Sequence, residues 1–400
     1  MTAALTDVAP EISAGWPASL APAVLGVIDL PTPYLVTDLD VVAQRHAAFS
    51  AALPGMLTCY AMKCNPAPEI LRTLAAGGAS FEIASLGELR ALRAVGVDPA
   101  TVLYSNPVKP PAHIVEAYDS GLWRFSFDSP GELAKIAGCA PGAAVYVRLS
   151  VDDSTSVFPL SRKFGTDVED AYDLMLLAQR LGLRPYGVTF HVGSQCVSPA
   201  AWWAAIGASG RLMRRLRGDG IELEMLDIGG GFPARYVDGV PSISEIGAAV
   251  GVALDELLPY RAALLVAEPG RYLVAEAGVV ATTVIGREER ADGHWLFLEV
   301  GVYNGLMEVL QTPGGWDFPM WSSRSDHAEA AQVPYTITGP SCDSTDTVGH
   351  GVRLPATLAV GDVVYIGSTG AYTLSYASSF NGFQPPTPIF VGAGKPRAGR

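Results

Sequence analysis

The sequence predicts a (β/α)8 barrel of the TIM type and a second, antiparallel β domain that forms a sandwich or barrel. One observation is that short β-type runs alternate with amphipathic helical patterns through the first two thirds of the chain. Another is that Val-, Thr- and Tyr-rich runs replace the helical patterns after about residue 275. The 400 residues, 49% of them hydrophobic, suffice for two domains. We expect the barrel in residues 38–275 and the β domain in residues 1–37 and 276–400.

Eight β-type runs define the predicted barrel. They cover residues 57–62, 80–84, 101–105, 124–127, 144–149, 187–192, 224–228 and 263–267. The amphipathic segments between them include residues 67–76, 86–95, 169–181, 199–217 and 243–256. In 169–181, for example, one helical face carries Ala171, Leu174, Leu177 and Ala178. An open doubly wound sheet is the alternative, but no Gly-rich phosphate-binding turn follows the first strand to favour it.

The predicted β domain consists of short strands separated by Gly, Pro and Asp. Its runs cover residues 278–285, 295–303, 333–338, 363–367 and 388–391. Residues 33–37, before a first helix at about 40–52, are also strand-like and join this domain. The first 20 and the last eight residues have the composition of loose termini.

Charge and cysteine content exclude several classes of protein. A net charge of −13 disfavours binding to nucleic acid or to anionic membranes. The five cysteines are scattered without metal-ligand spacing, which suits a reducing cytoplasm and indicates no metal site. No apolar run reaches the roughly 20 residues of a membrane span, and the N-terminus lacks the pattern of a signal peptide. We therefore expect a soluble, cytoplasmic protein.

Polar or glycine residues close almost every predicted barrel strand. They are Lys63, Glu82, Asn106, Asp128, Arg148, His191, the turn Gly229–Gly231, and Glu268. Because barrels build active sites from the loops at the C-terminal ends of their strands, a ring of such residues predicts an active site.

Lys63 ends the first predicted strand and is the first candidate for chemistry. Burial disfavours the charged form of a lysine, so we expect a lowered pKa and a nucleophilic amine suited to Schiff-base formation. The alternative is a lysine that reaches solvent or pairs with a carboxylate. Lys109 and Lys163 are the fallback candidates for the reactive lysine.

The turns after the last two barrel strands predict a phosphate site. Three consecutive glycines let backbone N–H groups approach an anion, although such a run also suits a bulge or a tight turn. Gly270 and Arg271 follow the eighth strand, and barrels often bind phosphate with these two loops. The two readings of Glu268 are a partner for a protonated ring nitrogen and a salt bridge with Arg271 or Arg148. His191 could stack on a flat cofactor or be a hydrogen-bonded core residue. Together these groups describe a pyridoxal 5'-phosphate (PLP) site.

Seven motifs resemble the fold-type III PLP-dependent decarboxylases of the ornithine decarboxylase family. They are Tyr60-Ala-Met-Lys-Cys-Asn-Pro66, Phe190-His-Val-Gly-Ser194, Asp227-Ile-Gly-Gly-Gly-Phe-Pro233, Glu268-Pro-Gly-Arg271, Gly339-Pro-Ser-Cys-Asp-Ser344, Gly370-Ala-Tyr-Thr373 and Phe380-Asn-Gly-Phe383. The resemblance spans about residues 30 to 392. It implies a head-to-tail homodimer with active sites shared at the interface.

The resemblance also implies a role for each matching residue. Lys63 would form the internal aldimine, His191 would stack on the pyridine ring and Glu268 would pair with the ring nitrogen. The phosphate would be held by Ser194, Gly230, Gly231, Gly270, Arg271 and Tyr372. Glu82 and Arg148 would order the lysine and its surroundings. From the other subunit, Cys342 would donate a proton to Cα and Asp343 would face the distal amine of the substrate, while Phe380 would line the substrate pocket.

By the same resemblance, the reaction is decarboxylation of a basic L-amino acid of the ornithine/lysine type, giving a diamine and CO2 as in polyamine biosynthesis. Glu268 favours the quinonoid that decarboxylation requires, whereas related alanine racemases place an arginine there. Asp343 suits a distal amine, whereas diaminopimelate decarboxylases carry Cys-Glu.

One departure from the family concerns substrate choice. Gln311 and Thr312 stand where many ornithine decarboxylases have an acidic residue, and an insertion follows at 314–319. Losing one charge-assisted hydrogen bond costs about 1.5–3 kcal/mol of binding. Asp317 could replace the carboxylate, or the substrate could be a larger or modified amino acid of a specialised pathway. A non-catalytic regulator of a partner decarboxylase is the third alternative.

Overall fold

The computed structural model describes Leu20, Leu25 and residues 30–160, 162–236, 239–312, 317–324, 327 and 329–392. The predicted loose termini lie outside the described residues except for Leu20, and so do residues 314–316 of the predicted insertion. None of the described helices is long and apolar enough to cross a membrane.

Eight parallel strands close into a barrel, which confirms the predicted fold class. They are β2 (Met56–Ala61), β3 (Ser80–Ile83), β4 (Leu103–Tyr104), β5 (Arg124–Phe127), β6 (Ala144–Leu149), β8 (Arg184–Phe190), β10 (Met225–Asp227) and β11 (Leu264–Ala267). Each predicted run coincides with one of these strands. The first and last strands close the ring through β2 and β11, where Leu57 is paired with Val266.

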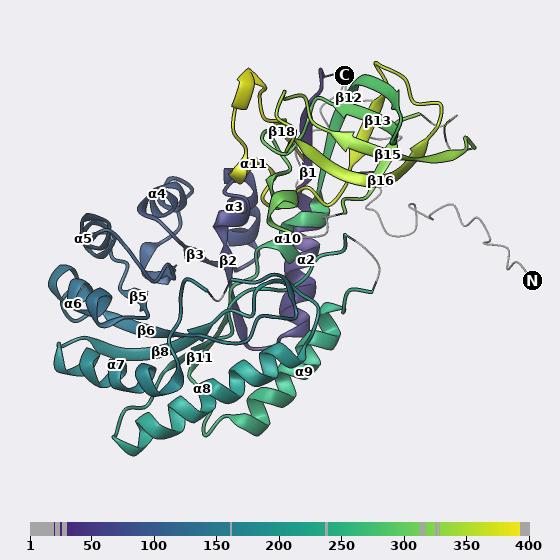
Figure 1. The fold of residues 1–400 in the computed structure, drawn as a ribbon. Helices are drawn as coiled ribbons and strands as arrows, with labels where there is room; N and C mark the ends of the chain where they lie inside the picture. Colours follow the sequence, from purple (N-terminus) through teal and green to yellow (C-terminus); the bar gives the residue numbers. More distant parts are fainter. Residues whose placement is uncertain are drawn as a thin grey trace, which may run out of the picture.

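Helices surround the barrel (Figure 1). They are α2 (Leu39–Ala52), α3 (Pro68–Ala76), α4 (Leu86–Ala94), α5 (Pro111–Asp119), α6 (Pro130–Cys139), α7 (Val168–Arg180), α8 (Ala200–Gly218) and α9 (Ile243–Leu257). Side-chain caps fix several of their starts: Ser242 and Glu245 form a capping box at α9. In α7, Ala171, Leu174 and Ala178 of the predicted apolar face are buried, whereas Leu177 is half-buried.

The barrel interior has its own apolar core. This cluster is contributed by strand residues: Cys59, Leu103, Ala144, Tyr146, Tyr186, Met225 and Val266. The residues that face the helices belong instead to the larger core cluster of the molecule. The interior is therefore filled with side chains, which leaves the mouth of the barrel as the place for an active site.

Eight further strands form one bent sheet, while β7 (Ser156–Phe158) and β9 (Ser194–Cys196) pair separately. The strands of the bent sheet are β1 (Tyr34–Asp38), β12 (Gly278–Arg290), β13 (Gly293–Leu298), β14 (Met320–Ser322), β15 (Gln332–Thr338), β16 (Thr347–Pro355), β17 (Val363–Ile366) and β18 (Thr387–Val391). The sheet is mostly antiparallel, as predicted, but β1–β18 and β13–β15 are parallel pairs. Strand β12 pairs β1 and β17 through its first half and β13 through its second, with a shift in register between Val284 and Gly286.

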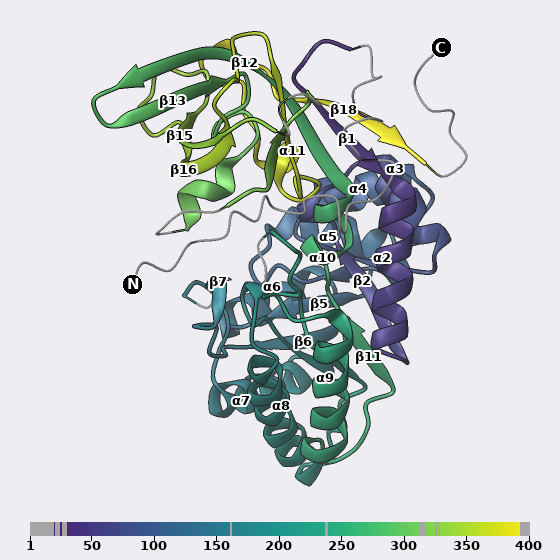
Figure 2. The same cartoon turned by 90° about the vertical axis from the view of Figure 1, so that its right-hand side faces the viewer.

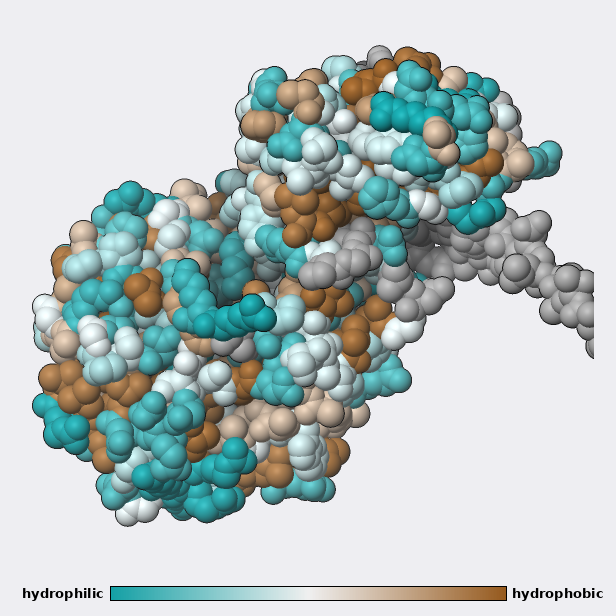
Figure 3. Space-filling view, viewed as in Figure 1, coloured by the Kyte–Doolittle hydropathy of each residue, from teal (hydrophilic) through white to brown (hydrophobic). Residues whose placement is uncertain are grey.

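The sheet sits at the end of the barrel where the strands finish (Figures 1 and 2). Two hydrogen bonds join the parts directly after β2: the N–H of Tyr372 donates to the carbonyl of Cys64, and the amide of Asn65 donates to the carbonyl of Gly370, both at 2.8 Å. On this face the surface is hollowed between the barrel and the β domain, and many of the side chains around the hollow are hydrophilic (Figure 3). The β domain thus stands beside the mouth of the barrel.

Short elements carry several candidate residues at this junction. They are η2 (Met62–Cys64), β7 (Ser156–Phe158), β9 (Ser194–Cys196), α10 (Arg271–Val274), η5 (Met307–Gln311), α11 (Thr373–Tyr376) and η7 (Phe380–Gly382).

Candidate active site

Five predicted site residues line one cavity at the carboxyl ends of the barrel strands. The cavity has a volume of about 650 Å³ and is lined by Lys63, Glu82, Arg148, His191 and Glu268. Lys63 lies in η2 directly after β2, while His191 and Glu268 directly follow β8 and β11. Parallel strands bring these positions together although they lie far apart in the sequence.

The charge state of Lys63 differs from the sequence-based expectation. The pKa of its amine is raised above the ordinary value, chiefly because the Glu82 carboxylate is nearby, and burial only partly opposes this. The prediction of a lowered pKa was therefore wrong, since it counted burial but could not see the acidic neighbour. Burial in turn raises the pKa of Glu82 to about 8, with Lys63 acting against that shift. One carboxylate oxygen of Glu82, Oε2, is buried without a hydrogen-bond partner.

The two fallback lysines lie in different surroundings. Burial lowers the pKa of Lys109 to about 8. Its amine donates to the carbonyls of Asn106 and Ser126 and pairs with Glu132 at 3.0 Å, so this residue has a structural role in the wall behind the site. Lys163 lines the cavity, where its amine lies 4.9 Å from the centre of the Phe164 ring. The lysine with the lowered pKa is thus Lys109, which does not line the cavity.

His191 is held as a neutral ring. Burial, then the charges of Lys63 and Arg148, place its pKa well below the ordinary value. Its Nδ1 accepts a hydrogen bond from the N–H of Gly193 at 3.0 Å, which assigns the proton of the neutral ring to Nε2 and fixes the orientation of the ring. A neutral planar ring at the cavity wall is suited to stacking on a flat ligand.

Glu268 belongs to a buried pair of carboxyl groups that the sequence analysis missed. Burial first, and then the neighbouring Asp227, raise the pKa of Glu268 well above its usual range. Burial raises the pKa of Asp227 to about 6. Ser105 donates to Oε1 of Glu268 at 2.5 Å and is itself bonded to the hydroxyl of Tyr146. Two adjacent carboxyl groups in such a place hold a proton between them at neutral pH.

Asp227 was within one of the quoted motifs but was given no role. Its carboxylate accepts hydrogen bonds from the N–H of Gly229 and the hydroxyl of Thr189, each at 2.9 Å. The available signal was a charged residue inside a strand that lies in the barrel wall, where an unpaired charge is costly.

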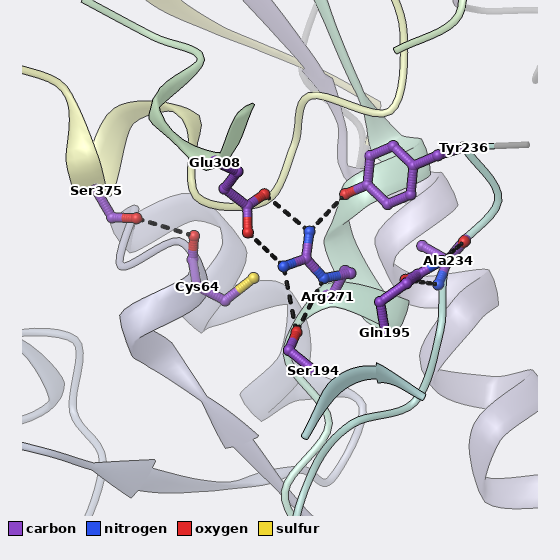
Figure 4. Close-up of polar contacts among 8 residues, drawn as sticks. All are labelled: Cys64, Ser194, Gln195, Ala234, Tyr236, Arg271, Glu308 and Ser375. Carbon is purple, nitrogen blue, oxygen red and sulfur yellow. Dashed lines mark hydrogen bonds and ion pairs between the residues drawn. The ribbon is translucent and has the colours of Figure 1, made fainter. Parts of the chain in front are cut away.

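Two of the predicted phosphate residues, Ser194 and Tyr372, lie beside Arg271, and Figure 4 shows the contact with Ser194. The guanidinium of Arg271 donates to Ser194 at 3.2 Å and lies 4.8 Å from the centre of the Tyr372 ring. It also donates to Tyr236 at 2.9 Å and to both carboxylate oxygens of Glu308, in an ion pair that sequence reasoning did not anticipate. Glu268 pairs with neither of the arginines suggested for it from the sequence; the carboxylate partner of Arg271 is Glu308.

Backbone geometry explains the glycine run. Gly229 and Gly231 have φ angles of +64° and +100°, which disfavour other residues. A Cβ on Gly230 would lie 2.7 Å from the carbonyl oxygen of Glu268 and 3.0 Å from Nε2 of His191. Glycine there lets the backbone pass between the His191 ring and the carbonyl of Glu268.

The predicted residues of the β domain gather at a separate place. The hydroxyl of Tyr303 donates to Asp343 at 2.9 Å, and the Tyr303 and Phe380 rings lie 4.5 Å apart. Cys342 is exposed, with its Sγ 3.5 Å from Asn381. Within one chain, none of these residues lines the cavity that holds Lys63.

The predicted selectivity positions are also outside that cavity. Gln311 and Asp317 are exposed, whereas Thr312 is buried and donates to the carbonyl of Val309 at 3.3 Å. No carboxylate of the described residues replaces them inside the cavity beyond Glu82 and Glu268.

The chain resembles known decarboxylases along nearly its whole length. Residues 39–275 match the model of the family described as pyridoxal-dependent decarboxylase, pyridoxal binding domain. A lysine/ornithine decarboxylase of Selenomonas ruminantium is 38% identical over 363 residues, which cover 90% of each chain.

Solved structures agree with the sequence comparison. The structure of SrLDC in complex with PLP and cadaverine is 36% identical, with a TM-score of 0.83 over 92% of each chain. The arginine decarboxylase of Paramecium bursaria Chlorella virus is 29% identical, with a TM-score of 0.87 over 93% of this chain and all of its own.

Proposed function

The chain belongs to the ornithine decarboxylase family of pyridoxal-dependent decarboxylases, and from this premise we propose how its cavity decarboxylates a basic L-amino acid. It is a PLP-dependent amino-acid decarboxylase. The observation that carries the proposal is the convergence of Lys63, His191 and Glu268 on one cavity at the barrel mouth.

The residues present fit the cofactor. Only glycine at position 230 leaves room for the backbone between His191 and Glu268, and Oε2 of Glu82 is a buried acceptor without a partner. Lys63 would hold the cofactor by its aldehyde, and Ser194 and Arg271 would bind its phosphate. When bound, PLP supplies a pyridine ring that accepts the electrons released as CO2 departs.

Lys63 and Glu82 are placed to exchange one proton. Without cofactor, the amine of Lys63 is held in its charged form by Glu82. A charged amine is not a nucleophile, so it must lose its proton before it reacts. In its ionised form Glu82, whose Oε2 is buried without a hydrogen-bond partner, is placed to take that proton.

Glu268 and Asp227 would hold the proton needed at the ring nitrogen of the cofactor. Their shared proton is retained at neutral pH because burial disfavours two charges side by side. A carboxyl group with a raised pKa can give its proton to a ring nitrogen and then pair with the resulting cation. Neutral His191, with its ring orientation fixed by Gly193, would stack on the face of the cofactor ring.

A homodimer completes the site in this proposal. Cys342 and Asp343 belong to a cluster that does not line the cavity of its own chain. Three aromatic side chains near this cluster are exposed: Tyr376, Phe380 and Phe383. Burial of such side chains against a second copy would bring the cysteine and aspartate to the mouth of the partner's barrel.

The proposed substrate is a basic amino acid with a distal amine, which Asp343 of a second copy would face. This matches the name of the lysine/ornithine decarboxylase of Selenomonas ruminantium, and the alternatives of a modified amino acid or a non-catalytic regulator are not favoured. The free cysteines support a cytoplasmic location.

The test is a panel of L-ornithine, L-lysine and L-arginine, with CO2 release and mass spectrometry of the amine product. We expect turnover of at least one of them to the matching diamine or agmatine. Cofactor-loaded protein that turns over none of the three would refute the substrate class. The matched control is Lys63→Ala, which separates enzymatic release from background.

A further inference from the structure

The carboxylate of Glu308 forms a buried ion pair with the guanidinium of Arg271. It contacts the guanidinium through both oxygens, with Oε2 at 2.8 Å from Nη1. The arginine side chain is 3% exposed and the glutamate side chain 6% exposed, so solvent screens the pair very little. The motifs point to phosphate binding for Arg271, but no motif gives Glu308 a role.

Such a pair changes what Arg271 can contribute to a bound phosphate. A free guanidinium in a buried site attracts a phosphate dianion strongly. A guanidinium already neutralised by a bidentate carboxylate offers hydrogen bonds but little net charge, and the carboxylate itself repels the phosphate. The hydroxyl oxygens of Tyr236 and Ser194 accept hydrogen bonds from the guanidinium and hold the arginine in place on its other sides (Figure 4).

We propose that Glu308 is an internal counter-anion that sets cofactor affinity: it positions Arg271 and limits the attraction of this arginine for the phosphate of PLP. The inference rests on the proposed function, because it assumes that Arg271 lies at the phosphate. Without Glu308, Arg271 would be a buried and poorly compensated charge in the cofactor-free protein. The ion pair therefore stabilises the empty site and weakens loading.

Glu308 also links the predicted phosphate site to the segment that carries the predicted selectivity positions. It lies in η5, the same short element that ends at Gln311 and is followed by Thr312. The segment with the predicted selectivity positions is thereby tethered to the phosphate site.

The test is a titration of cofactor-free protein with PLP. Binding is monitored by the absorbance of the lysine-bound cofactor. Glu308→Gln keeps the shape and one acceptor but removes the charge. We expect its dissociation constant for PLP to fall about tenfold or more, the size of one charge-assisted interaction. Pyridoxal, which lacks the phosphate, should bind within about twofold of wild type, since the effect acts on phosphate alone. Unfolding of the cofactor-free variant should occur at a lower temperature.

Glu276→Gln is the matched control, because Glu276 pairs with Arg45 outside the site. It should leave both dissociation constants unchanged. If Glu308→Gln binds PLP no tighter than wild type, or gains equally for pyridoxal, the proposal is overturned. Wild type that binds no PLP, or Lys63→Ala that retains the lysine-bound absorbance, would instead refute the proposed function.

A second pair of variants covers the case in which Glu308→Gln does not fold. Arg271→Gln alone leaves the Glu308 carboxylate facing the phosphate, whereas Arg271→Gln with Glu308→Gln removes both charges. The double variant should bind PLP about tenfold more tightly than Arg271→Gln, because the repulsion is gone. Equal or weaker binding by the double variant would overturn the proposal.

Discussion

Replacing Glu268 by glutamine tests how the carboxyl pair supports catalysis. In wild type, burial and then Asp227 raise the pKa of Glu268. In the proposed function this carboxyl group would protonate the ring nitrogen and pair with the cation. In wild type, the hydroxyl of Ser105 donates to the Glu268 carboxylate at 2.5 Å. Glutamine has the same shape, and its amide oxygen can accept this hydrogen bond. The amide can also donate to Asp227. We therefore expect the variant to fold and to bind PLP.

The expected loss is in turnover. An amide cannot give a proton to the ring nitrogen or compensate its charge, so one charge-assisted hydrogen bond disappears as charge develops. Such a bond contributes about 1.5–3 kcal/mol, which corresponds to a fall in kcat of about 10- to 150-fold. Glu268→Asp, which keeps the acid but shortens the reach, should lose less.

The assay is kcat at saturating substrate, with cofactor content measured by absorbance in the same samples. Glu276→Gln again serves as a carboxylate-to-amide control away from the site. If cofactor-loaded Glu268→Gln retains kcat within a few-fold of wild type, Glu268 does not supply the ring-nitrogen proton. If it loses the cofactor instead, the residue acts in binding.

Three further predictions concern the lysine, the dimer and the buried pair. Lys63→Ala should abolish turnover and the absorbance of lysine-bound cofactor, whereas retained absorbance would point to Lys163. Mixing inactive Lys63→Ala with inactive Asp343→Ala under subunit exchange should restore up to about a quarter of wild-type activity, since half the dimers are mixed and each has one intact site; no restored activity would place Asp343 in its own chain's site. The pKa of Asp227 is about 6 in the folded protein against an ordinary value of 3.8. The free energy of unfolding of wild type therefore falls as pH rises through that range, because the buried carboxyl group has to ionise. Asp227→Asn, which does not ionise, should therefore gain stability relative to wild type by up to about 3 kcal/mol between pH 4 and 6; a difference in unfolding temperature that stays constant with pH would contradict the shift.

The fold was predictable because its signals are local. Each barrel strand is a short apolar run bounded by turn residues, and the helices between them show one buried face, as α7 does. The polar residues at the strand ends also predicted the site, because a barrel with this alternation places residues such as Lys63 and Glu268 at one mouth. The two parallel pairs of the β domain were missed, because strand direction depends on connections across the sheet.

The details of the site depended on distances that no local pattern encodes. Burial at a strand end predicted a lowered pKa for Lys63, but the approach of Glu82 from the next strand reverses the direction. The ion pair between Arg271 and Glu308 joins a barrel residue to an element of the β domain. Neither partner has a sequence signal that points to the other.

By itself, the sequence determined the family, the cofactor, the barrel and the set of side chains at its mouth, because these follow from periodicity, strand order and motifs. Only the tertiary structure decided which charges face each other: Glu82 at Lys63, Asp227 at Glu268 and Glu308 at Arg271. The physical reason is that Coulomb energies in a buried site change steeply over a few ångströms. Protonation states and phosphate affinity are therefore properties of the folded arrangement rather than of the residue types.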